Sequence, residues 1–220
     1  MSKTRPYARH GAGRDEMVRS LAAALGVAVA KATLNAIAGI GSAEPLTVER
    51  APHAIAPARM AEAEPESRRD ESRATYERCL HTYRTVVRAE DAAQPVDDAG
   101  AALAFFVAAN LNALHDIDAT RETLARLERQ LAGVAGHAPA WNSGSRTERQ
   151  FYVEHLAILG VFIAGHAARA RTQGPAAVAT VRAAARRYLQ RVLGLNPDLL
   201  TLGSDGLELR TSGRQQRRVA

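Results

Sequence analysis

The chain of 220 residues has a single cysteine, Cys79, and only two lysines, Lys3 and Lys31. One cysteine excludes an internal disulfide and a thiolate metal cluster built from neighbouring residues. We expect Cys79 to be a small, buried side chain on the apolar face of a helix. Because nearly all of the 29 basic residues are arginine and alanine is abundant, the composition indicates a coding bias, and the high isoelectric point says little about function.

Aromatic residues are also scarce, at 5% of the chain, although hydrophobic residues make up 46%. Much of the apolar surface is therefore alanine, so each helix buries little area unless the helices pack closely. The Ala99–Leu114 and Phe151–Ile163 segments are apolar nearly all around a helix, which predicts that both are buried. Two buried helices with amphipathic neighbours predict an all-α fold, a bundle of about five helices.

Motifs of catalysis and nucleotide binding are missing as well. No glycine-rich phosphate loop, nucleophile elbow or zinc-binding histidine pair occurs in the sequence. His155 and His166 share a helix face but lie about 16 Å apart, too far for one metal ion. The adjacent Asp97 and Asp98 are expected to cap a helix rather than to act as catalytic carboxylates. We therefore predict no catalytic residue, no metal site and no cofactor, and the chain leans towards a non-enzymatic protein.

The charge is distributed unevenly along the chain. Residues 62–128 hold 14 acidic residues and eight arginines, whereas residues 155–197 hold six arginines and no acidic residue. We expect the acidic first half of the bundle to face the basic second half. In the alternative interpretation, four arginines of the last helix form an exposed stripe that binds a polyanion such as phosphate or anionic lipid. These candidate binding residues are Arg182, Arg186, Arg187 and Arg191.

The amino-terminal segment resembles a secretory signal. A polar, basic stretch precedes the ten-residue apolar run Leu21–Ala30, and small residues offer cleavage sites after Ala30 or Ala43. This pattern predicts export to the periplasm or beyond. The alternatives are an alanine-rich amphipathic helix over about residues 15–37 that docks on the bundle or on a membrane surface, and a disordered leader.

Prolines and acidic residues mark the region that follows. Four prolines fall between Glu44 and Asp70 without a sustained hydrophobic period, which predicts a disordered linker. The chain is thus divided into a leader at 1–43, a linker at 44–70, a helical bundle at 71–202, and a turn with an arginine-rich tail at 203–220.

Caps and breakers delimit the five expected helices. The first runs from about Glu71 to a point before Pro95, the second from a cap at Asp97 or Asp98 to His115, and the third from Asp118 or Thr120 to Gly133. Ser145 and Glu148 form a capping box that opens the fourth helix, which ends near Arg171. The fifth extends from Pro175 to Gly194, and residues 207–209 are expected to pair briefly as a strand.

Of Asn110 and Asn112 within the second helix, at least one should point inward and form an interhelical hydrogen bond, or else anchor a small molecule.

Three segments also carry a family resemblance. DDAGAALAFFVAANLNAL (97–114), EHLAILG (154–160) and LGLNPDLLTLGSDGL (193–207) resemble an uncharacterised family of bacterial helical proteins, often exported, over about residues 70–210. The resemblance implies a helical fold and an envelope location, but no activity and no site residues.

The sequence favours two functions over a third, an enzyme or small-molecule carrier with a site between helices, which no group of residues supports. The first is a non-enzymatic bundle, exported to the envelope, that acts through a protein partner, self-association or surface contacts and binds no specific nucleic acid. The second is a cytoplasmic protein that binds nucleic acid or an anionic surface through the fifth-helix arginines and the tail.

Overall fold

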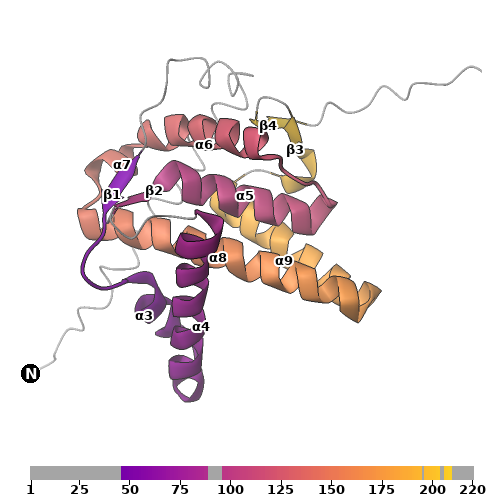
Figure 1. Cartoon of the computed structure of the whole chain (residues 1–220), viewed down its shortest axis with the longest axis horizontal. Helices are drawn as coiled ribbons and strands as arrows, with labels where there is room; N and C mark the ends of the chain where they lie inside the picture. Colours follow the sequence, from indigo (N-terminus) through magenta and orange to yellow (C-terminus); the bar gives the residue numbers. More distant parts are fainter. Residues whose placement is uncertain (1–45, 89–95, 195, 204–205, 210–220) are drawn as a thin grey trace, which may run out of the picture.

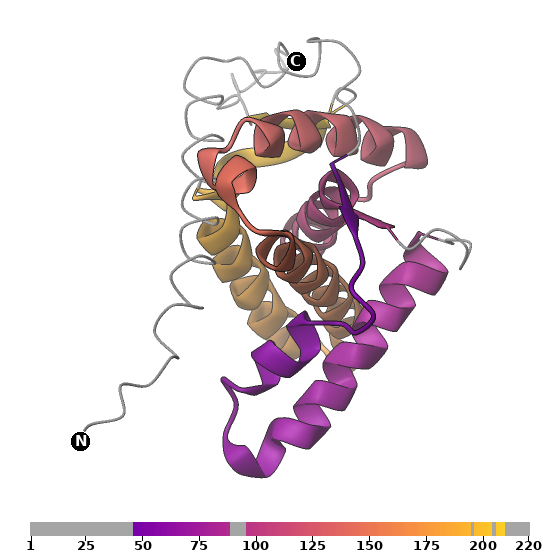
Figure 2. The same ribbon diagram turned by 90° about the vertical axis from the view of Figure 1, so that its left-hand side faces the viewer.

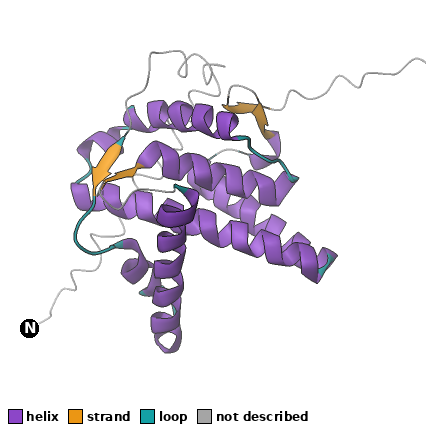
Figure 3. Cartoon of the chain, in the orientation of Figure 1, coloured by secondary structure: helices purple, strands orange, loops and turns teal. Residues whose placement is uncertain are grey.

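The computed structural model describes residues 46–88, 96–194, 196–203 and 206–209. The described part is mostly helical, which confirms the all-α prediction (Figure 3). The predicted leader, residues 1–43, and most of the tail lie outside the described residues. The elements are β1 (Thr47–Glu49), α3 (Ala56–Ala61), a 3-10 turn (Glu66–Arg68), α4 (Arg69–Thr82), a π-helical turn (Tyr83–Val87), β2 (Val96–Asp98), α5 (Ala99–His115), α6 (Arg121–Gly136), α7 (Pro139–Ser143), α8 (Arg146–Gln173), α9 (Pro175–Leu193), a 3-10 turn (Pro197–Leu199), β3 (Leu200–Gly203) and β4 (Gly206–Leu209).

Helix α5 lies at the centre of the bundle and contacts α6, α8 and α9 (Figure 1). Most of its residues are buried, as the all-round apolar pattern predicts. Glycines permit the closest helix contacts. A Cβ atom at Gly100 would lie 2.7 Å from Ala132 of α6, and one at Gly160 of α8 would lie 2.7 Å from the ring of Phe105. Small residues therefore allow the close packing that a core poor in aromatic residues needs.

Helix α8 is buried in its first half and partly exposed in its second. The run from Gln150 to Ile158 is buried except at His155, whereas Phe162 is only half-buried and Gly165 is exposed. The prediction that Phe162 lies in the core is therefore wrong, because the second half of α8 extends beyond α5. Among the described helices, α8 alone is long and apolar enough to cross a membrane. However, 56% of its most apolar 18-residue stretch is buried inside the fold.

The predicted starts of α5, α6 and α8 are confirmed. Asp98 accepts a hydrogen bond from the Ala101 amide at the start of α5, and Thr120 caps α6. Both halves of the Ser145–Glu148 capping box are present. The ends are less accurate, since α6 continues past Gly133 to Gly136 and the expected loop that follows it contains the short helix α7.

Residues 46–88 form what we call the arm. It consists of β1, α3 and α4; α3 and α4 project from the body formed by the remaining helices, whereas β1 lies against it (Figures 1 and 2). Strand β1 pairs with β2 in an antiparallel register, with Val48 opposite Asp97. The expected linker is therefore structured from residue 46 to residue 70. Its order comes from contacts with α8, nearly a hundred residues away, which no local hydrophobic period could reveal.

Candidate functional site

Three polar side chains in the first half of α8 contact the arm. Arg146, Gln150 and Glu154 are spaced four residues apart, so they lie along one helix face. Each forms hydrogen bonds with main-chain atoms of residues 49–56, and we call these three side chains the ladder. The ladder fixes residues 49–56, which bend at Pro52, His53 and Ile55, through their backbone.

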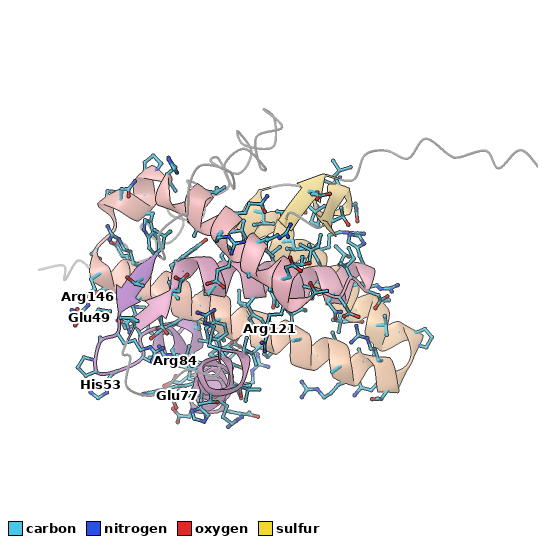
Figure 4. All side chains as sticks on the ribbon, turned by 45° about the horizontal axis from the view of Figure 1, so that its top comes forward. Glu49, His53, Glu77, Arg84, Arg121 and Arg146 are labelled. Atoms are coloured by element: carbon cyan, nitrogen blue, oxygen red, sulfur yellow. The ribbon has the colours of Figure 1, made fainter. Side chains whose placement is uncertain are left out.

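The first two members bind successive peptide groups. Arg146 donates to the carbonyl oxygens of Glu49 and Arg50 at 3.2 and 3.1 Å, and it pairs with the Glu49 carboxylate (Figure 4). The Gln150 amide oxygen accepts from the Ala51 N–H at 2.9 Å, while its Nε2 donates to the His53 carbonyl. Gln150 is buried, so both contacts replace hydrogen bonds that water would otherwise supply.

Glu154 is fully buried and supplies the start of α3 with a cap. Its Oε2 accepts from the Ile55 and Ala56 amides at 2.7 and 2.8 Å. Its Oε1 accepts from Gln150 Nε2 and from Arg84. No side chain of α3's own segment caps this helix, so a carboxylate from α8 satisfies the exposed amides.

Arg84 joins Glu154 to a second buried carboxylate. Its guanidinium bonds both oxygens of Asp97, and Arg50 donates to the same carboxylate at 2.8 Å. Arg84 lies on the π-helical turn that ends the arm, a rare backbone form often found at functional positions. Of the two candidate caps, Asp98 caps α5, while Asp97 belongs to this network. The one signal that could have revealed this network is the four-residue spacing of Arg146, Gln150 and Glu154.

The carboxy-terminal hairpin is held in the same manner. Strands β3 and β4 pair antiparallel, which confirms the strand expected at residues 207–209. Buried Gln130 of α6 accepts from the Leu207 N–H at 2.8 Å and donates to the Leu207 carbonyl at 3.1 Å. Side chains of the core helices thus fix the backbones of both flanking segments.

The four candidate arginines do not behave alike, although all are exposed. Arg182 pairs with Asp116 at the end of α5, and its hydrogen bond holds the pKa of Asp116 below the ordinary value. Arg186 pairs with Asp198, 2.7 Å away. Within the described part of the chain, Arg187 and Arg191 have no acidic partner. Arg182 therefore forms the predicted pair between the acidic first half and the basic second half of the bundle. Arg187 and Arg191 face solvent.

The remaining polar candidates lie apart from one another. His155 stacks on Phe151, and His166 contacts Phe162 with ring centres 4.3 Å apart. Burial and the nearby Arg169 lower the pKa of His166. Cys79 is half-buried, and burial raises its pKa. Over the described ranges, no group of three or more histidine, cysteine or acidic side chains is placed to hold a metal ion.

Asn110 points inward, as expected, but its side chain donates to Phe106 of its own helix. The interhelical contact is formed by Asn112, which accepts from Arg171 of α8 and donates to Asp118. In the described part of the molecule the buried Oδ1 of Asn110 and the hydroxyl of Tyr152 have no hydrogen-bond partner. Burial raises the pKa of Tyr152 far above its ordinary value.

These contacts define a mostly helical domain in which buried polar side chains hold an amino-terminal arm and a carboxy-terminal hairpin. The chain belongs to a family of unknown function, DUF6683, whose model matches residues 28–210. This match confirms the resemblance to an uncharacterised family. No curated protein and no solved structure matches the chain.

Proposed function

We propose that this protein is a non-enzymatic helical bundle, exported to a bacterial cell envelope, that acts through contacts of its surface with a protein partner. The observation that supports this proposal most strongly is the use of its buried polar groups. Asp97, Gln130, Gln150 and Glu154 all bond to arginines or main-chain atoms of this same chain. These groups use their hydrogen bonds to hold segments of the chain together. We therefore assign the function to the surface of the protein.

The exposed face of α9 is the surface that we assign to partner contacts. Arg187 and Arg191 lie four residues apart on α9 and extend into solvent. Arginine is enriched where proteins bind one another, since its planar guanidinium forms several hydrogen bonds at once. An acidic protein surface would complement this face.

Export is tested by the mature amino terminus of the full chain expressed with a carboxy-terminal tag in a bacterium. Mass spectrometry of the purified protein should show cleavage after Ala30 or Ala43. Leu25→Arg, which places a charge inside the apolar run, should block cleavage, whereas Val18→Arg, which adds the same charge before the run, should not. An uncleaved chain in the cytoplasmic fraction would refute export.

The contact surface is tested with a photo-cross-linking amino acid placed at Arg187, Arg191 or, as a control on α6, Arg121. A discrete adduct of one mass from the two α9 positions, absent at Arg121, would support the proposal. Equal labelling at all three positions would contradict it.

The absence of an acidic partner for Arg187 and Arg191 among the described residues also favours a second candidate, an anionic-surface or nucleic-acid binder. Such binding releases counterions and is steeply salt-dependent. We expect only weak DNA binding at low salt, driven by residues 210–220 and lost near physiological salt. Binding that is tight enough to persist at physiological salt, survives deletion of this tail and fails when the four α9 arginines become glutamate would favour the second candidate.

A further inference from the structure

The second half of α8 has one side that the rest of the described fold leaves partly exposed. Its side chains recur at intervals of three or four residues, so they lie along one side of the helix. These residues, which we call the α8 face, are Leu159, Phe162, His166 and Arg169. Among the described half-buried side chains, Leu159 packs against the core, whereas Phe162 does not. The Phe162 ring contacts His166 of its own helix and is accessible to another molecule.

The surroundings of the α8 face are basic. No acidic residue occurs from residue 155 to residue 197, although this stretch holds six arginines. On α9, Arg187 and Arg191 lie on the same side of the helix as Tyr188, which packs against the core. Within the described ranges, Arg169, Arg187 and Arg191 are exposed and have no acidic partner. An acidic ligand would complement this charge.

Three helices limit what can reach the α8 face. Both α4 and α9 pack against α8. Burial raises the pKa of Tyr76 on α4, Glu64 adds to the shift, and Tyr188 of α9 also contributes, so the two tyrosines lie near each other. Before the face begins, Arg59 of α3 lies 5.3 Å above the ring of Phe151. Because α3 and α4 project beyond α8, a narrow element fits here better than a flat surface such as a bilayer does (Figures 1 and 2).

We propose that the partner binds the α8 face with an amphipathic acidic helix, whose apolar side lies on Phe162 and whose carboxylates pair with the three exposed arginines. This inference rests on the proposed function, because it names the part of the partner that meets the α9 surface. A helix suits the site, since α8 offers side chains rather than a strand edge. The face is about 15 Å long, the length of about ten helical residues.

Fluorescence anisotropy with a synthetic peptide tests the inference on the full chain. The probe is a fluorescein-labelled peptide of about 16 residues, in which leucines spaced as on the α8 face form one side of a helix and glutamates flank them. One control peptide has the same residues in an order without helical period, and another has lysine in place of glutamate. We expect the probe to bind at least about tenfold more tightly than either control peptide.

Variants of the protein locate the binding site. Phe162→Ala should weaken probe binding by about tenfold or more, because the ring supplies the apolar contact. The double variant with Arg187→Glu and Arg191→Glu should weaken it by a similar factor, because the carboxylates of the probe then meet like charges.

Matched controls change the same properties elsewhere on the surface. Leu199→Ala removes an exposed apolar side chain next to Asp198, which pairs with Arg186. Arg121→Glu combined with Arg129→Glu on α6 gives the same change in net charge as the α9 double variant. Both controls should bind the probe as tightly as the wild-type chain, and circular dichroism should show that every variant is folded.

Several results would overturn the inference. Equal binding of all three peptides would do so, as would a Phe162→Ala chain that binds the probe normally. Phe162-dependent binding to phosphatidylglycerol vesicles in place of the probe would identify a membrane as the ligand. A photo-cross-linking amino acid at position 162 that joins two copies of the chain, or joins α8 to the leader, would show that the chain itself covers the α8 face.

The inference and the proposed function can fail separately. A discrete adduct at Arg187 and Arg191, together with probe binding that ignores Phe162, would overturn the helical partner and leave the partner contact of α9 standing. Probe binding that requires Phe162, without an adduct at either arginine, would support a helix-binding α8 face and contradict the assignment of partner contacts to the α9 surface.

Discussion

The two halves of α8 have similar apolar sequences and different surroundings. The first half carries the ladder and lies beneath the arm, so even Gln150 and Glu154 are buried there. In the second half, Phe162, Gly165 and His166 are half-buried or exposed. Burial of a residue in this helix is therefore set by what covers it, and a polar residue can lie deeper than an aromatic one when its hydrogen bonds are satisfied.

Removal of Glu154 should have the largest effect. Glu154→Ala leaves two amides of the arm without their acceptor and leaves Arg84 with Asp97 alone, and we expect a loss of about 3–5 kcal/mol in the free energy of unfolding. The control is Glu122→Ala, whose exposed pair with Arg126 should be worth less than about 1 kcal/mol. Urea denaturation measures both, and equal effects would mean that the ladder does not stabilise the arm.

Truncation of apolar residues compares the two halves directly. Ile158 is fully buried, so Ile158→Ala should cost about 2–5 kcal/mol. Phe162→Ala should cost less, about 1–2 kcal/mol, because a half-buried ring gives up only part of its transfer free energy. Urea denaturation again measures the change, and a larger loss at Phe162 would place the core in the second half instead.

The two glycines of α8 should respond with opposite signs. A methyl group at Gly160 would meet the Phe105 ring, which already contacts Tyr83, so Gly160→Ala should destabilise by about 1–3 kcal/mol. A methyl group at Gly165 would meet no atom of the described residues within 4 Å, so Gly165→Ala should stabilise the helix by about 0.5–1 kcal/mol. Thermal melting separates the two cases, and a stabilising Gly160→Ala would contradict the close packing of α5 on α8.

Tyr152→Phe should change the free energy of unfolding by a smaller amount. Most truncations of buried side chains lower that free energy, but this one should not. The hydroxyl is buried and unpaired in the described structure, so its removal should leave stability unchanged or raise it by about 1 kcal/mol. A clear loss of stability in denaturation would show that the hydroxyl has a partner in solution.

His166 should provide the smallest effect, visible mainly by NMR. Its lowered pKa means that the fold favours the neutral ring, so its contribution to stability is complete above the unfolded pKa of about 6.5 and is lost as the pH falls. The ring should titrate below that value, and His166→Gln should reduce the acid sensitivity of the melting temperature. Titration above 6.5 would be inconsistent with partial burial in the second half of α8.

The sequence alone determined the helices, because their signals are local. Asp98, Thr120 and the Ser145–Glu148 box act on amides within three residues, so their spacing is visible in the chain. The apolar pattern of α5 likewise required burial on most sides, and the structure confirms it.

Only the tertiary structure decided which residues connect distant segments. The ladder on α8 orders a proline-rich stretch that has no hydrophobic period of its own. Of the two candidate caps of α5, Asp97 instead binds Arg50 and Arg84. The same holds for the α9 arginines, where pairing depends on Asp116 and Asp198 reaching them in space. Contacts between residues many tens of positions apart depend on how helices pack, and hydrophobic period and capping signals do not encode that arrangement.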